Sequence, residues 1–110
     1  MHDFIYIIQE WASFGISEIA YCLDEKIAIS KFKQIVKEEI AKAKKDGTWA
    51  KQEDLDRVIP NGHIEKSDAE FDKNELYSAT ISTWYKSSYE YDEWDIGGST
   101  FKLVKRELVK

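Results

Sequence analysis

Hydrophobic and polar positions near the start of the chain follow the pattern of two β-strands. Residues 4–11, "FIYIIQEW", and residues 16–23, "ISEIAYCL", are rich in β-branched and aromatic side chains, and "ASFG" separates them. This pattern predicts a β-hairpin over residues 4–23 that turns around Gly15. Because residues 5–8 are an almost continuous apolar run, we expect the first strand to be covered on both faces.

The hydrophobic period then changes from two residues to three and four. Apolar residues recur at this spacing over residues 28–43 while lysines occupy the positions between them, which predicts an amphipathic helix over residues 26–46. Asp24 is placed to cap the helix N-terminus, and Gly47 can adopt the left-handed conformation that ends a helix. The apolar face of this helix is expected to pack against the sheet.

Residues 48–74 have scattered apolar positions and the breaker "IPNG", and they are rich in acidic residues. This pattern predicts an irregular acidic connector, with a short helical turn within residues 51–58. A connection of this length is uncommon without regular structure, so we expect its apolar residues to pack it onto the sheet. A second helix in the connector would instead make the fold ferredoxin-like, with the order β-α-β-β-α-β.

Alternation of apolar and polar residues returns at Leu76 and predicts a β-meander over residues 76–109. "KSS" at residues 86–88 and "IGGS" at residues 96–99 are the expected turns between its three strands. The whole chain, residues 1–110, is then expected to be a single α+β domain. Its antiparallel sheet of about five strands, in the order β-β-α-connector-β-β-β, would pack against one main amphipathic helix.

Composition and charge limit the classes of function. The chain has 110 residues and a net charge of −5, which disfavours nucleic-acid binding because clustered cations are needed to replace counterions. Cys22 has no second cysteine with which to form a disulfide, and the N-terminus has no signal-peptide pattern and no membrane-spanning segment. We therefore expect a cytoplasmic protein with no membrane association.

The sequence lacks residues that known metal sites require at fixed positions or in sufficient number. Acidic residues alternate from Asp68 onward as in an EF-hand loop, but Lys73 stands where glycine is needed and Ala79 where the bidentate glutamate is needed. A zinc site needs about four Cys or His ligands, and the chain has Cys22 and two histidines. The sequence therefore predicts no metal, no cofactor and no catalytic set, and it favours a non-enzymatic protein over an enzyme.

The stretch "SYEYDEWDIGG", residues 88–98, combines aromatic rings with carboxylates, a combination that suits a protein interface better than a phosphate-binding surface. The leading hypothesis is a small acidic binding protein, such as an inhibitor or adaptor of a phage or mobile element. Its partner would be a protein, preferably with a basic surface, or a second copy of the chain. The interface candidates are Tyr89, Glu90, Tyr91, Asp92, Glu93, Trp94 and Asp95.

The alternative hypothesis is a module that binds a small molecule or nucleotide at the seam of an oligomer. Aromatic rings would stack a planar ligand and cations would neutralise its anionic group. The candidates for these two tasks are Trp84, Tyr85, Lys33, Lys37 and Arg106.

Overall fold

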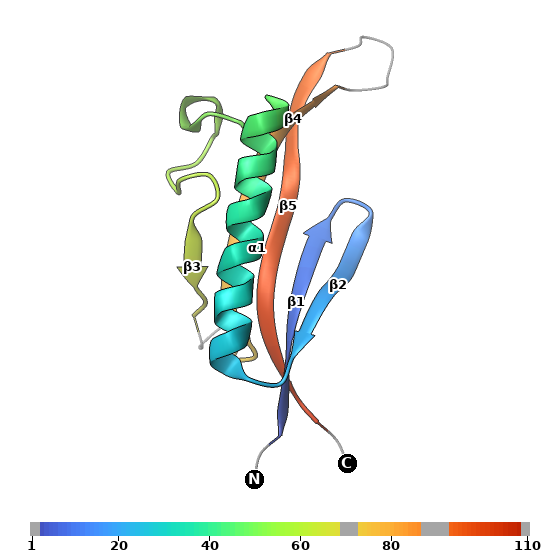
Figure 1. The fold of residues 1–110 in the computed structure, drawn as a ribbon. Helices are drawn as coiled ribbons and strands as arrows, with labels where there is room; N and C mark the ends of the chain where they lie inside the picture. Colours follow the sequence, from blue (N-terminus) through green and yellow to red (C-terminus); the bar gives the residue numbers. More distant parts are fainter. Residues whose placement is uncertain (1–2, 69–72, 87–92, 109–110) are drawn as a thin grey trace.

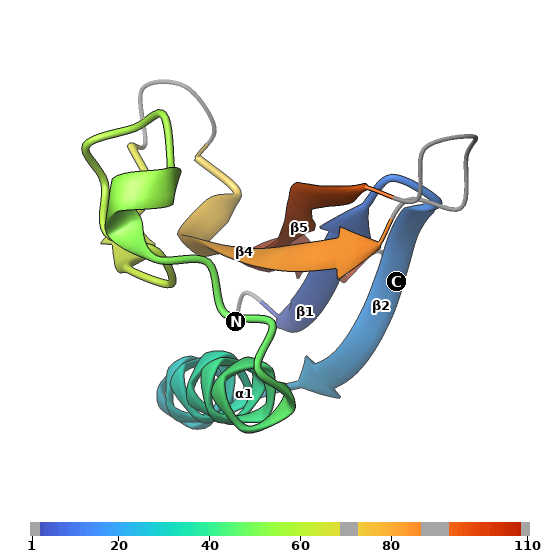
Figure 2. The ribbon, with the colours of Figure 1, turned by 90° about the horizontal axis from the view of Figure 1, so that it is seen from above.

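The fold is a five-stranded antiparallel sheet with one long helix across one of its faces, as the computed structural model shows (Figures 1 and 2). The structure describes residues 3–68, 73–86 and 93–108. The sheet has the strand order β2-β1-β5-β4-β3, which confirms the predicted α+β class. The elements in chain order are β1 (Phe4–Ala12), β2 (Gly15–Cys22), α1 (Glu25–Asp46), the 3-10 helix η1 (Gln52–Asp54), β3 (Ile64–Lys66), β4 (Glu75–Lys86) and β5 (Trp94–Glu107).

The predicted hairpin and helix are both confirmed, and local sequence explains their ends. β1 and β2 pair in antiparallel register up to the turn before Gly15. The Asp24 side chain accepts a hydrogen bond of 2.9 Å from the backbone N–H of Ile27, which satisfies a free donor of the first helical turn. Gly47 ends α1 in the left-handed conformation with φ of 73°.

The hydrophobic core lies between α1 and the sheet. Phe32 and Val36 extend from the helix into this layer, where they meet Ile8 of β1 and Leu103 of β5, and all four are fully buried. Ile7, the neighbour of Ile8 on β1, points to the opposite face and is also buried. The expectation that the first strand is covered on both faces is therefore confirmed at these two positions.

The prediction of a turn at residues 96–99 is wrong. Gly97 and Gly98 lie within β5, which runs without interruption between β1 and β4. A Cβ atom on Gly98 would lie 2.0 Å from the backbone oxygen of Ile81 on β4, so this glycine permits close approach of two strands. The predicted three-stranded meander is consequently two long strands, and the fifth strand of the sheet is β3, inside the predicted connector. Residues 87 and 88 of the predicted "KSS" turn lie outside the described residues.

The connector packs onto the outer edge of β4 instead of crossing open solvent. Its described residues, 48–68 and 73–74, contain η1 and β3 and no second α-helix, so the order of the described elements differs from that of the ferredoxin-like alternative. Backbone N–H groups donate across this edge from Trp84 to Thr48 (2.7 Å), from Ala50 to Ser82 (3.2 Å) and from Gly62 to Thr80 (2.9 Å). The edge of β4 is therefore covered well beyond the three residues of β3.

Asn61 completes this edge with its side chain. Its amide nitrogen donates to the backbone oxygens of Ser82 (2.9 Å) and Ala50 (3.0 Å), and its Oδ1 accepts from the backbone N–H of Ser82 (2.7 Å). The carboxamide therefore bonds Ser82 as the backbone of a neighbouring strand would. One side chain replaces a strand residue where the connector leaves the sheet.

Asn61→Ala is expected to lower the free energy of unfolding by about 2–3 kcal/mol, because it leaves partly buried backbone groups without their partner. Urea unfolding followed by circular dichroism measures this loss. Gln34→Ala is the matched control, since the Gln34 amide also bonds a side chain but does so on the exposed face of α1. A loss for Asn61→Ala no larger than the control would contradict the role of Asn61 in holding the connector.

Candidate functional site

The predicted acidic and aromatic interface is only partly within the described residues. Positions 89–92 lie outside them, whereas Glu93, Trp94 and Asp95 are exposed at the start of β5. Trp94 is 60% exposed and pairs across the sheet with Lys86. An accessible ring is what an interface at this position requires, and its use as an interface stays a prediction.

The cations proposed for ligand binding lie on different parts of the molecule. The Lys33 ammonium lies 5.9 Å from the centre of the Tyr77 ring, on the side of α1 that faces β4, and Lys37 follows one helical turn later. Arg106 lies near the end of β5, where its guanidinium is 3.6 Å from the Glu18 carboxylate. These three cations do not converge on one anion site.

The aromatic ligand-binding candidates lie at the far end of the β4–β5 pair from Arg106. Trp84 faces Ile96 across the two strands, and the Tyr85 hydroxyl donates to the Asp95 carboxylate at 3.5 Å. Because consecutive residues of a strand point to opposite faces, Trp84 and Tyr85 do not stack against one ligand. None of the five candidates lines the groove described next.

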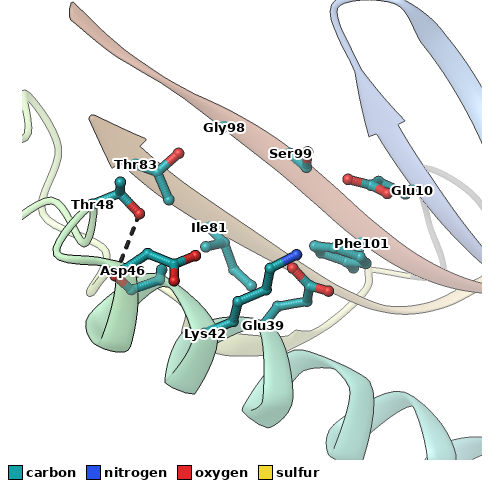
Figure 3. A pocket seen from close by; sticks show the side chains of 11 residues that line it. Glu10, Glu39, Lys42, Asp46, Thr48, Ile81, Thr83, Gly98, Ser99 and Phe101 are labelled. Atoms are coloured by element: carbon teal, nitrogen blue, oxygen red, sulfur yellow. Dashed lines mark hydrogen bonds between the residues drawn. The ribbon is translucent and has the colours of Figure 1, made fainter. Parts of the chain in front are cut away.

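A groove of about 180 Å³ lies between the C-terminal half of α1 and the sheet (Figure 3). Lys42 and Glu39 extend from the helix toward the sheet beside Phe101, which forms part of the groove's apolar floor, and Glu10 lies on the β1 side (Figure 3). The described residues contain no group of three or more His, Cys, Asp or Glu side chains arranged to hold a metal ion. The mixed charges of this open groove select no particular ligand class.

The edge of the sheet formed by β2 is the most distinctive surface of the described residues. Among the described strands β2 has β1 as its only neighbour, so half of its backbone N–H and C=O groups point outward. Large apolar side chains that are 44–79% exposed accompany this free edge. We call them the β2 edge surface: Phe14, Ile16, Ile19, Tyr21 and Leu23.

The β2 edge surface is nearly neutral in a protein of net charge −5. From residue 13 to residue 23 the only charged side chain is Glu18, which forms an ion pair with Arg106 and accepts a hydrogen bond from the Tyr21 hydroxyl. This hydrogen bond raises the pKa of Tyr21. The edge therefore offers a partner hydrogen-bonding backbone and apolar side chains with almost no free charge.

Sequence reasoning missed this edge, although a signal for it was present. "ISEIAYCL" carries apolar residues at both odd and even positions, which would place them on both faces of a strand. A chain with one long helix covers one face of its sheet, so the apolar side chains of the other face need a second cover. The order of the strands, which makes β2 an edge, could not be read from the sequence.

Comparison with models of known protein families, with curated proteins and with solved structures finds no match for this chain. Within the described residues, no helix has both the length and the apolar character needed to cross a membrane. The function must therefore be argued from the geometry of this chain itself.

Proposed function

We propose that this protein is a non-enzymatic binding protein that engages another polypeptide through the β2 edge surface. A single observation carries the proposal: one edge of the sheet is covered along β4, whereas the other is an eight-residue strand with exposed apolar side chains. Natural proteins usually protect such edges with charge, proline, a β-bulge or a covering segment, because an open edge recruits other strands. β2 has one bulge, at Ile19, and one charge, Glu18, with exposed apolar side chains on both sides of them. An inhibitor or adaptor acts through a surface of this kind.

Strand addition is the binding mode that suits this surface. In that mode the partner's backbone bonds to the free edge and supplies affinity, while alternate side chains supply specificity. On the face turned away from α1, Ile16 and Tyr21 lie beside Trp11 and Ile7 of β1. A partner strand with apolar residues on this face would extend an existing apolar row.

The near-neutral β2 edge surface calls for an apolar partner segment, whereas the basic partner expected from the sequence would suit the acidic start of β5 around Trp94. Both surfaces would bind a protein, but the β2 edge surface suits an uncharged partner segment and the start of β5 suits a basic one. Salt dependence of binding separates them, since screening weakens contacts between charged surfaces more than strand addition.

Photo-cross-linking in the cells that naturally make the protein tests the proposed function. With the photoreactive residue p-benzoylphenylalanine in place of Ile16, we expect covalent adducts with a polypeptide after irradiation. The matched control carries the same residue in place of Val58, which is 95% exposed on the connector and remote from β2 in the chain. Absence of adducts from position 16, or equal adducts from both positions, would contradict a binding role for this edge.

A further inference from the structure

We infer that the polypeptide bound at the β2 edge surface is a second copy of this chain, with the two β2 strands paired antiparallel across a two-fold axis. The inference rests on the proposed function and names the partner of that same surface. It joins two five-stranded sheets into one continuous sheet with both helices on the same side.

The contrast between the two sheet edges determines which self-association is possible. Head-to-tail contact would require the β2 edge of one copy to bind the β3–β4 edge of the next, and the connector already bonds along that edge through Thr48, Ala50, Asn61 and Gly62. Contact of β2 with β2 uses the same surface twice and closes after two copies. The covered edge therefore favours a closed dimer over an open fibre.

A β-bulge in β2 makes this strand complementary to itself. Gln9 of β1 pairs with Glu18 and Ile8 pairs with Ala20, so one extra residue, Ile19, is inserted into β2. On the Gly15 side of the bulge, Ile16 faces away from α1. On the Cys22 side of the bulge, Tyr21 faces away from α1 as well. Ile16 and Tyr21 are five residues apart and would point to opposite faces of a strand without a bulge.

This arrangement selects one register. Residues opposite each other across a two-fold axis perpendicular to the sheet must point to the same face. With the axis between Glu18 and Ile19, Ile16 lies opposite the partner's Tyr21 on the face away from α1. Ser17 then lies opposite Ala20 of the partner subunit on the face toward α1. In this register the residues of β2 on both sides of the bulge, from Gly15 to Ser17 and from Ala20 to Cys22, are paired with matching faces.

The side of α1 nearest to β2 is also complementary to itself. Lys31, Ile35 and Glu38 are among the mostly polar residues that line an open groove along α1, and they lie opposite the side on which Lys33 lies over β4. The axis crosses β2 about 12 Å from its Cys22 end. The helix begins beside that end and runs back along the strand (Figure 1). A distance of about 12 Å corresponds to about eight helical residues, so the level of the axis lies close to Gln34.

The two helices of the dimer are antiparallel, so the charged residues of the second helix occur in the reverse order along the same direction. Lys31 and Glu38 lie on either side of the level of the axis, and each is therefore level with the opposite charge of the second copy: Lys31 with the partner's Glu38. Ile35 is level with Gln34 of the partner subunit.

Paired charge substitutions test the register. Ile16→Glu/Tyr21→Glu places like charges opposite each other twice per dimer, whereas Ile16→Glu/Tyr21→Lys removes the same apolar groups and places opposite charges there. Analytical ultracentrifugation is expected to give the wild type twice the monomer mass. It is expected to give a dimer dissociation constant at least about tenfold weaker for the Glu/Glu variant than for the Glu/Lys variant. Equal constants for the two variants would overturn the register.

Disulfide trapping provides a second readout that needs no change in charge. In a Cys22→Ser background, mild oxidation of Ile16→Cys/Tyr21→Cys is expected to yield a covalent dimer, because only across the axis are these positions within disulfide distance. Ile16→Cys alone, Tyr21→Cys alone and Val58→Cys serve as controls that should form no covalent dimer. Circular dichroism of each variant shows that it is folded, and a folded double variant that stays monomeric would overturn the pairing.

The outcomes separate this inference from the proposed function. A wild-type protein that is monomeric at about 100 µM, a concentration well above the dissociation constants of stable homodimers, would overturn the self-pairing. Photo-adducts from position 16 to a different polypeptide would at the same time preserve the proposed function. Absence of any adduct from position 16 would remove the function together with the inference.

Discussion

Gly98→Ala is expected to lower the free energy of unfolding by about 3–4 kcal/mol. The new Cβ would lie 2.0 Å from the backbone oxygen of Ile81 and 3.0 Å from the Cα of Ser82. No side-chain rotation can relieve a clash with backbone, so β4 and β5 must move apart and lose part of their hydrogen-bonded ladder. Such a loss is a large fraction of the roughly 5–15 kcal/mol that stabilises a typical domain.

The neighbouring glycine provides the control. A Cβ on Gly97 would lie 2.8 Å from a ring atom of Tyr85, which is a half-exposed side chain that can rotate away. Gly97→Ala is therefore expected to cost less than about 1 kcal/mol. Urea unfolding of both variants under the same conditions measures the difference. Equal losses would show that β4 and β5 do not approach each other at Gly98 as closely as the structure has them.

Phe32→Ala is expected to destabilise the protein by about 3–5 kcal/mol. Phe32 is 0% exposed and lies at the centre of the layer between α1 and the sheet, with its ring centre 6.3 Å from that of Tyr77. Truncation removes the buried ring and leaves a cavity that the long helix and the sheet cannot close without disturbing their other contacts. Thermal unfolding followed by circular dichroism is expected to show a correspondingly lower midpoint.

Phe14→Ala is the same substitution at the tip of the β1–β2 hairpin, where Phe14 is 79% exposed. Its expected effect on the unfolding of the monomer is within about 0.5 kcal/mol. The losses in the free energy of unfolding for Phe32→Ala and Phe14→Ala together show whether the core is confined to the layer under α1 or extends to the hairpin. A large loss for Phe14→Ala in a monomeric sample would mean that the exposed hairpin residues are part of the core.

The hairpin and the helix could be predicted because their causes are local. β-Branched and aromatic residues on both sides of Gly15 favour two strands and a turn, and the three- and four-residue spacing of apolar positions favours α1. Asp24 and Gly47 act within a few residues of themselves, so the caps were also correct. The fold class followed from these elements, since one amphipathic helix and a set of strands must share a core.

The glycine pair and the connector could not be predicted because their causes are distant in sequence. Gly97 and Gly98 were interpreted as a turn, which is the common use of such a pair, but Gly98 is required by the approach of Ile81 from another strand. Asn61 occurs in "IPNG", which was interpreted only as an interruption of regular structure in the connector. Its bonds to Ser82 exist only after the connector has folded onto β4.

The candidate site divides in the same way. From the sequence alone one could predict apolar residues on both faces of the second strand, a single charged residue among residues 13–23, and an acidic aromatic segment before β5. Only the tertiary structure decided that β2 is an edge, because strand order depends on long-range pairing of β1 with β5. Local preferences determine which segments form strands and which form a helix. Long-range pairing determines the order of the strands, and the order determines which backbone groups remain free to bond a partner.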